Sequence, residues 1–327
     1  MTEEHILEVN NLKTYFSVDS KTYKAVDGVS FNIKKGETFC IVGESGSGKS
    51  VTSLSIMGLV PKPNGEIVDG SIRFEGKDLT QLTNQELTDI RGNDIAMIFQ
   101  EPMTSLNPVL PIGFQITEGL LRHKELTKSQ ARKKAIELLK EVGIGRADEI
   151  FNSYPHQLSG GMRQRVMIAI AISCQPRLLI ADEPTTALDV TIQAQILELM
   201  KDVKEMTDSA ILLITHDLGV VAEMADRVLV MYAGQVVEEA SVTELFDHPK
   251  HPYTKGLLES IPKLDEEQKR LSQIKGIVPS SDEFPEGCRF APRCKFATEE
   301  CLTGDITFRQ LDNDHKVRCV LYDDVNA

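Results

Sequence analysis

The sequence predicts an α/β fold in which a mostly parallel β-sheet is covered by helices on both faces. Two observations carry this prediction. Short apolar, β-branched segments alternate with segments of helical periodicity along most of the 327 residues, which is the pattern of parallel sheets. A glycine-rich turn near residue 43 also joins an apolar strand to a helix, a connection typical of such folds.

The first 75 residues are predicted to be mainly strands, antiparallel at the N-terminus, with one helix among them. A glycine-rich turn begins at Gly43, and an apolar helix runs from Lys49 to a stop at Gly58. Residues 67–75 are interpreted as a strand pair, because Asp69 and Gly70 form a preferred hairpin dipeptide. Turn-forming residues separate the other three strands, which are Ile6–Val9, Val29–Ile33 and Thr38–Val42.

Residues 102–165 are predicted to form a helical subdomain inserted into the sheet. Thr127 and Gln130 have the spacing of a capping box, and Gly143 supplies a helix stop. Between them the apolar residues recur at helical spacing, at Ala131, Ala135, Leu138, Leu139 and Val142. Strands and helices then alternate again, over Leu178–Ala181, Ile192–Met206, Ile211–Thr215 and Val228–Tyr232.

The chain is longer than a usual single domain, so we expect a large domain and an appended part. Periodicity weakens after Gly256, and residues 276–305 are rich in Pro, Gly, Asp and Cys. We therefore expect one domain over residues 1–255 and a small cysteine-rich C-terminal extension over residues 256–327.

Composition limits the possible partners and location. The net charge of −13 argues against nucleic acid, since binding it requires a basic face. No segment approaches the roughly 20 consecutive apolar residues of a membrane-spanning helix. The N-terminus has neither the basic start nor the apolar core of a secretion signal, so a cytoplasmic location is expected.

A phosphate-binding loop is the strongest functional signal. Its glycines let backbone N–H groups point into a concave nest, and the following helix start adds positive potential. Lys49 is expected to reach the β- and γ-phosphates of ATP, and the Ser50 hydroxyl is expected to bind Mg²⁺. The sequence therefore predicts a P-loop NTPase (RecA-like) core. The motif G-x-x-x-x-G-K-S comprises Gly43, Glu44, Ser45, Gly46, Ser47, Gly48, Lys49 and Ser50.

A pair of carboxylates follows the apolar segment Leu178–Ala181. Asp182 is delivered at the C-terminal end of this strand, where open α/β sheets bind ligands. It fits the Mg²⁺ carboxylate of a P-loop enzyme, and Glu183 is placed to polarise the attacking water as a general base.

The sequence Leu158-Ser159-Gly160-Gly161-Met162 precedes another predicted helix. A serine hydroxyl and two glycine amides at a helix start form a second anion site. This sequence closely resembles the signature of ABC ATPases, and the resemblance covers residues 5–255. It implies that two cassettes dimerise head to tail. Ser159, Gly160 and Gly161 would then act on the γ-phosphate of ATP held by the partner, so that ATP binding closes the dimer.

Further residues lie where the family resemblance places functional groups. Gln100 resembles the glutamine that contacts Mg²⁺, water and the membrane partner. Asp189, in the sequence Ala187-Leu188-Asp189, resembles the loop at the dimer interface, and His216 resembles the histidine that contacts the γ-phosphate.

The resemblance also implies an aromatic side chain near the N-terminus that stacks on adenine. Phe16 aligns best with that position, and Tyr15 and Tyr23 are alternatives.

The six cysteines fall into two groups. Cys40 and Cys174 lie in apolar segments and are interpreted as small core residues. The other four lie in a loop-rich segment, which suggests a metal site, although their spacing lacks the close pairs of structural zinc sites. Four thiolates also suit a [4Fe–4S] cluster, and free thiols are the third possibility. These four are Cys288, Cys294, Cys301 and Cys319.

A second resemblance narrows the family to the dipeptide/oligopeptide permease ATPases, some of which carry an iron–sulfur cluster on such cysteines. It rests on His251–Leu258 (HPYTKGLL), on Gly287-Cys288 and Arg293-Cys294, and on Gln100–Pro108 (QEPMTSLNP). With LSGGM, the chain is more similar to the first (D-type) of two paired ATPases. An iron–sulfur cluster is thus expected ahead of zinc or free thiols.

The resemblance implies a peripheral subunit on the cytoplasmic face of the cell membrane that powers di- or oligopeptide import. The implied partners are a second homologous ABC ATPase in a heterodimer, two transmembrane permease subunits and an extracellular solute-binding protein. Two alternatives stay open: an importer of nickel or another solute, and an ABC ATPase that is not involved in transport.

Overall fold

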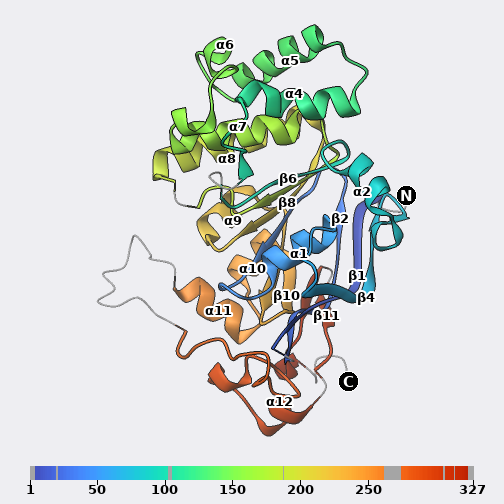
Figure 1. The fold of residues 1–327 in the computed structure, drawn as a ribbon. Helices are drawn as coiled ribbons and strands as arrows, with labels where there is room; N and C mark the ends of the chain where they lie inside the picture. Colours follow the sequence, from blue (N-terminus) through green and yellow to red (C-terminus); the bar gives the residue numbers. More distant parts are fainter. Residues whose placement is uncertain are drawn as a thin grey trace. The chain divides into compact units, whose positions relative to one another are not determined.

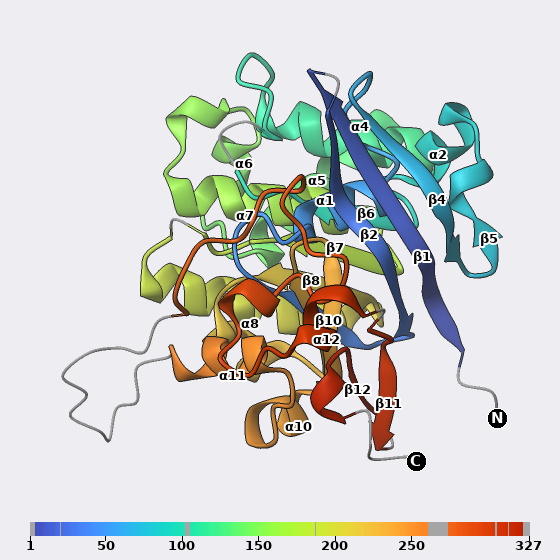
Figure 2. The same cartoon turned by 90° about the horizontal axis from the view of Figure 1, so that it is seen from below.

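The computed structural model describes residues 4–19, 21–101, 105–186, 188–260, 274–304, 306–312 and 314–322 (Figures 1 and 2). The chain divides into two compact units. Strands alternate with helices in both, so the α/β class is confirmed. Unit 1 comprises Met1–Ile6, Ile33–Glu37 and Gln81–Leu213, and unit 2 comprises Leu7–Asn32, Thr38–Thr80 and Ile214–Ala327.

Unit 1 contains three neighbouring strands in the order β8-β7-β6. β6 (Ile95–Ile98) and β7 (Leu178–Asp182) are parallel, and β8 (Ala210–Thr215) lies mostly in this unit. β7 and β8 are buried throughout, which explains their nearly continuous apolar sequences. Among the described residues, the helices of unit 1 are α2 (Asn84–Ile90), α4 (Ile112–His123), α5 (Lys128–Glu141), α6 (Ala147–Ile150), α7 (Gly160–Ile172) and α8 (Val190–Thr207).

The predicted helical segment is present as a group of helices in unit 1, coloured green in Figure 1. α7 contacts strand β6 and also packs against α4 and α5. The predicted capping box starts α5, because Thr127 Oγ1 accepts from Gln130 N at 3.3 Å and Gln130 Oε1 accepts from Thr127 N at 2.8 Å. One apolar face of α5 is buried, as its periodicity predicts, at Ala131, Ala135, Leu138 and Leu139.

Unit 2 contains a mixed arrangement of strands in the order β11-β12-β10-β9-β3. β3 (Thr38–Val42) and β9 (Arg227–Tyr232) are parallel. β10 (Gln235–Ser241) is antiparallel to β9 and to β12 (His315–Val317), and β12 is antiparallel to β11 (Arg309–Asp312). The expectation of a mostly parallel sheet is therefore corrected to a mixed sheet. The reason is that the tight turn after Tyr232 returns β10 beside β9 as a hairpin.

A second sheet has the order β2-β1-β4-β5. β1 (His5–Val18) and β2 (Lys21–Lys34) continue well beyond the short segments predicted from the sequence. Their added residues are mostly polar, and buried apolar residues such as Leu12 and Val26 are isolated among them, so they lack the apolar signal of a buried strand. β4 is Gly65–Phe74, and β5 is Lys77–Asp78.

The predicted turn at Asp69 and Gly70 is wrong, because both residues lie inside the single strand β4. The register between β1 and β4 shifts at this point, as in a β-bulge. Gly70 has a φ of 92°, and a Cβ there would lie 2.5 Å from the carbonyl oxygen of Asn11. This glycine thus marks a close approach of two strands and not a hairpin turn.

The helices of unit 2 are short. The first follows β3 after the loop of residues 43–48, and the last two belong to the C-terminal part of the chain. No helix among the described residues is long and apolar enough to cross a membrane. The bounds are α1 (Lys49–Ile56), α9 (Leu218–Met224), α10 (Val242–Asp247), α11 (Pro252–Glu259) and α12 (Glu299–Thr303).

Glu238 is a fully buried carboxylate on β10 that joins three segments of unit 2. It accepts hydrogen bonds from the backbone N–H groups of Lys250 at 2.7 Å and His251 at 2.8 Å. Its Oε1 also lies 2.7 Å from Nε2 of His315 on β12. A carboxylate tolerates burial only with such partners, so Glu238 fixes β12 and the α10–α11 connection to β10.

Replacement of Glu238 by Ala should destabilise the protein, because it leaves two buried N–H groups and His315 without their acceptor. We expect the free energy of unfolding to fall by about 3 kcal/mol, measured by chemical denaturation. The matched control is Glu66→Ala on the exposed side of β4, for which we expect a change of less than about 0.5 kcal/mol. Equal losses in the two variants would contradict this account.

Candidate functional site

The predicted phosphate loop connects β3 to α1 in unit 2. β3 is completely buried, and α1 begins at Lys49 directly after Gly48. The Lys49 side chain is 5% exposed, and its ammonium donates to the carbonyl oxygens of Gly43 at 2.8 Å and Glu44 at 3.1 Å. The loop therefore curls around its own lysine, and Ser50 follows in the first helical turn.

The loop packs so closely that one of its positions admits only glycine. Gly48 has a φ of 101°, and a Cβ there would lie 2.4 Å from the carbonyl oxygen of Ala25. The loop is also bonded to the hairpin turn between β9 and β10, where Gly234 N donates to Ser47 O at 2.9 Å. The curvature of the loop is thus imposed by surrounding backbone.

Two side chains from the C-terminal part of unit 2 hold the loop at Glu44. The Glu44 N–H donates to the Tyr253 hydroxyl at 2.8 Å. Burial raises the pKa of the Tyr253 hydroxyl. The Arg293 guanidinium donates to both Glu44 carboxylate oxygens, at 2.6 and 3.1 Å. Neither contact is predictable from the sequence, because no local pattern indicates a partner that is hundreds of residues away.

Within unit 1, the structure brings Gln100 and Glu183 together. β6 and β7 are parallel neighbours, so the residues that follow them emerge at the same edge of the sheet. Gln100 Nε2 donates to Glu183 Oε2 at 2.8 Å, and Thr186 Oγ1 donates to the same oxygen at 2.9 Å. Asp182, the last residue of β7, is 5% exposed.

Glu183 has a left-handed backbone conformation, with a φ of 47°. Such a conformation is uncommon for a residue with a side chain and stores strain of about 1 kcal/mol or more. Residues of this kind concentrate at functional sites, because the surrounding structure must hold them in place.

The signature segment also lies in unit 1. Ser159 is the N-cap of α7, where its hydroxyl accepts from Met162 N at 3.3 Å, and Gly160 and Gly161 form the first turn. Ser159 and Gly160 are exposed. Asp189 is likewise an exposed N-cap, and its Oδ1 accepts from Ile192 N at the start of α8 at 2.9 Å. Ala187 lies outside the described residues.

His216 and the three candidate adenine contacts lie in unit 2. His216 is exposed and follows the last residue of β8. Phe16 is half-buried opposite Gly65 on β4, where a Cβ on Gly65 would meet its ring at 2.6 Å. The Tyr15 hydroxyl donates to Asp27 Oδ1 at 2.7 Å, and Tyr23 is 38% exposed. The assignment of the stacking residue stays a prediction.

The iron–sulfur prediction is contradicted. Among the described residues, no group of three or more His, Cys, Asp or Glu side chains is placed to hold a metal ion. The free volume of the cavity lined by the four late cysteines is about 10 Å³, which is room for about one water molecule. All four thiols are free, and burial raises the pKa of three of them: Cys288, Cys294 and Cys319, the last to about 11. Cys301, the fourth, is buried.

Comparison with known proteins identifies the family. Residues 26–186 match the family described as "ABC transporter", and residues 237–301 match "Oligopeptide/dipeptide transporter, C-terminal region". The oligopeptide transport ATP-binding protein AppD of Bacillus subtilis is 62% identical over 322 residues, which is 98% of each chain. The chain belongs to the ATP-binding proteins of ABC transporters, in the oligopeptide/dipeptide group. It is therefore an ABC-type ATPase.

Other relatives support the same family. The dipeptide transport ATP-binding protein DppD of Escherichia coli is 48% identical over 314 residues, covering 96% of each chain. A solved ATP-binding cassette, dimeric and bound to ADP and Pi, has a TM-score of 0.66 at 30% identity, covering 72% of this chain and 98% of its own. The P-loop cassette fold of this ABC ATPase is thereby confirmed. The names of these relatives do not mention an iron–sulfur cluster.

Gly48→Ala should weaken ATP binding by this ABC ATPase, because the added methyl group cannot fit beside Ala25. A strain of about 1–3 kcal/mol corresponds to roughly a 5- to 150-fold loss of affinity, which isothermal titration calorimetry measures. The control is Gly76→Ala, since Gly76 has a φ of 80° but no atom within 4 Å of a Cβ. Equal ATP affinity in both variants would refute the close-packing argument.

Proposed function

We propose that this chain is the ATP-hydrolysing subunit that energises an importer of di- and oligopeptides, bound peripherally to the cytoplasmic face of the membrane. The observation that carries this proposal is full-length similarity to peptide transport ATPases, which includes the C-terminal region over residues 237–301. An importer of nickel or another solute, and a role outside transport, have less support, since these relatives are named for oligopeptide or dipeptide transport.

ATP binding is assigned to the phosphate loop. The amides of residues 43–48 and the Lys49 ammonium would hold the phosphates, and Phe16 is the proposed adenine contact. Ser50, Gln100 and Asp182 offer hydroxyl, amide and carboxylate oxygens, which is the donor chemistry that Mg²⁺ prefers. When bound, Mg²⁺ neutralises charge on the β- and γ-phosphates.

Hydrolysis is assigned to Glu183 as the general base. Gln100 and Thr186 both donate to its Oε2, and a carboxylate held in this way can act as the base toward a water molecule. These hydrogen bonds also fix the orientation of the carboxylate, which favours proton abstraction from one direction. His216 is the proposed contact to the γ-phosphate.

Dimer formation is assigned to the exposed caps of α7 and α8. Ser159, Gly160 and Gly161 present a helix N-terminus suited to the γ-phosphate held by the partner, and Asp189 is placed at the interface. The proposed partner is a second homologous ABC ATPase in a heterodimer. ATP binding would favour the closed dimer, and hydrolysis would favour the open one. This alternation would drive two transmembrane permease subunits, which receive the solute from an extracellular solute-binding protein.

Co-purification from gently solubilised membranes tests this assembly. With the chain tagged at native expression, we expect to recover two multi-spanning subunits, a second ABC ATPase and a solute-binding protein. The ligand of that binding protein then identifies the cargo. Recovery of ribosomes or nucleic-acid factors, with no membrane subunits, would overturn the transport proposal and leave the ATPase assignment unaffected.

Glu183→Gln should retain ATP binding but lower the hydrolysis rate by about 10²- to 10⁴-fold, because the general base is lost. The same variant should accumulate as a closed dimer in ATP, detected by size-exclusion chromatography. Glu198→Gln is the matched control, since Glu198 is exposed on α8. This control variant should hydrolyse ATP at the wild-type rate. Hydrolysis by Glu183→Gln at that rate would show that another residue is the base.

A further inference from the structure

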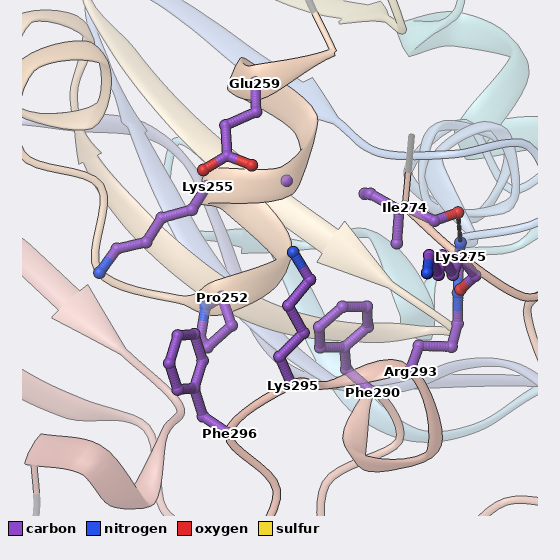
Figure 3. A pocket seen from close by; sticks show the side chains of 10 residues that line it. Pro252, Lys255, Glu259, Ile274, Lys275, Phe290, Arg293, Lys295 and Phe296 are labelled. Carbon is purple, nitrogen blue, oxygen red and sulfur yellow. Dashed lines mark hydrogen bonds between the residues drawn. The ribbon is translucent and has the colours of Figure 1, made fainter. Parts of the chain in front are cut away.

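A cavity with a free volume of about 220 Å³ lies in unit 2 beside helix α11, outside the motifs discussed above (Figure 3). α11 contributes Pro252, Lys255 and Glu259 to its wall, and the segment around the short turn Ala291–Arg293 contributes most of the remainder. Its volume is slightly below the roughly 300–1,000 Å³ of drug-sized ligand sites, so it suits a small molecule.

The charges around this cavity favour an anion. Lys255, Lys275, Lys295 and Arg293 line it together with one carboxylate, Glu259. In the part of the chain that the structure describes, none of the three lysines takes part in an ion pair, whereas Arg293 is paired with Glu44. A concave site with excess positive charge attracts anions in a chain whose net charge is −13.

The apolar part of the lining favours a flat ligand body. Phe290, which is 4% exposed, and Phe296, which is 58% exposed, lie on either side of Lys295 in Figure 3. Pro252 and Ile274 extend the apolar surface. Aromatic side chains bind planar groups through large contact areas, so an aromatic or otherwise flat body is expected against the exposed Phe296 ring and its apolar neighbours.

One residue of this lining is bonded directly to the phosphate loop. The Arg293 guanidinium, 5% exposed, donates to both carboxylate oxygens of Glu44. Its Nε also donates to the carbonyl oxygen of Lys275 at 3.0 Å, and Nη1 donates to the Tyr232 hydroxyl at 3.3 Å. An anion in the cavity would compete electrostatically with the Glu44 carboxylate for this guanidinium.

We propose that this cavity is a regulatory site that binds a small organic anion with a flat apolar body, and that the bound anion weakens ATP binding through Arg293 and Glu44. The effect on ATP binding rests on the proposed role of the phosphate loop, whereas binding of the anion to the cavity does not. Lysine ammonium groups act as point charges and do not distinguish carboxylate from phosphate, so either anion is compatible with the site.

Binding is tested by calorimetry on the full-length protein with three probes that share one ring system. These are 2-naphthoate, 2-naphthyl phosphate and the neutral 2-naphthamide, each added while a non-hydrolysable ATP analogue fills the phosphate loop. We expect at least one anion to bind tenfold or more tightly than the amide. Tighter binding of either anion supports the proposal, and equal binding of all three probes, or of none, overturns it.

Two variants locate the site. Replacing Lys255 and Lys295 together by Glu should weaken anion binding at least tenfold, and Phe296→Ala should weaken binding without changing charge. The matched control replaces the exposed Lys62 and Lys77 of the same unit by Glu. Unchanged anion affinity in the first two variants, or an equal loss in the control, would place the probe elsewhere and refute this site.

Coupling is tested by measuring ATP affinity with and without the preferred anion. We expect the anion to weaken ATP binding about fivefold or more, and ATP to weaken anion binding by the same factor, because linkage is reciprocal. Normal ATP affinity without the anion shows that the ATP site is intact. Anion binding with no effect on ATP would refute the coupling, whereas failure of ATP binding itself would count against the proposed function.

Discussion

The close approach of backbone around the phosphate loop is the constraint on which the rest of the candidate site depends. Gly48 lies against the carbonyl of Ala25, and the loop is bonded through Ser47 to the β9–β10 hairpin. This packing leaves the Lys49 ammonium enclosed by loop carbonyls, which compensate for its burial. The loop is thus preorganised, so little conformational entropy remains to be lost when a ligand binds.

The two residues of unit 1 that we propose for hydrolysis illustrate a different use of rigidity. Glu183 holds an uncommon backbone conformation while its side chain accepts hydrogen bonds from Gln100 and Thr186. A strained residue with a fixed side chain can orient one lone pair accurately, at the expense of local stability. The burial of β7 and its parallel pairing with β6 supply the support that this arrangement needs.

Sequence reasoning placed the motifs well because each depends on local chemistry. The capping box before α5, the carboxylates after β7 and the loop before α1 all require particular residues at fixed short spacings. It failed where a residue's role depends on a distant neighbour. Asp69 and Gly70 predict a turn in the sequence, because the closeness of Gly70 to Asn11 across the strands is not visible there.

The same limit applies to the C-terminal part of the chain. Arg293 and Glu44 are separated by 249 residues, so no local pattern indicates their ion pair. The four late cysteines show the opposite case, in which the sequence suggests a site that the described part of the structure does not contain. Their number suggested a metal, but a count of thiols does not state the distances between sulfur atoms, and the described residues hold no metal-binding group.

Strand β12 gives the C-terminal segment a role that its irregular composition conceals. It covers the outer edge of β10, and His315 reaches the buried Glu238. Removing this segment would uncover a row of unpaired backbone N–H and C=O groups, which is a template for aggregation. A shortened form that retains every nucleotide motif would therefore be a poorly behaved protein, and evolution could not readily exchange this tail between cassettes as an independent module.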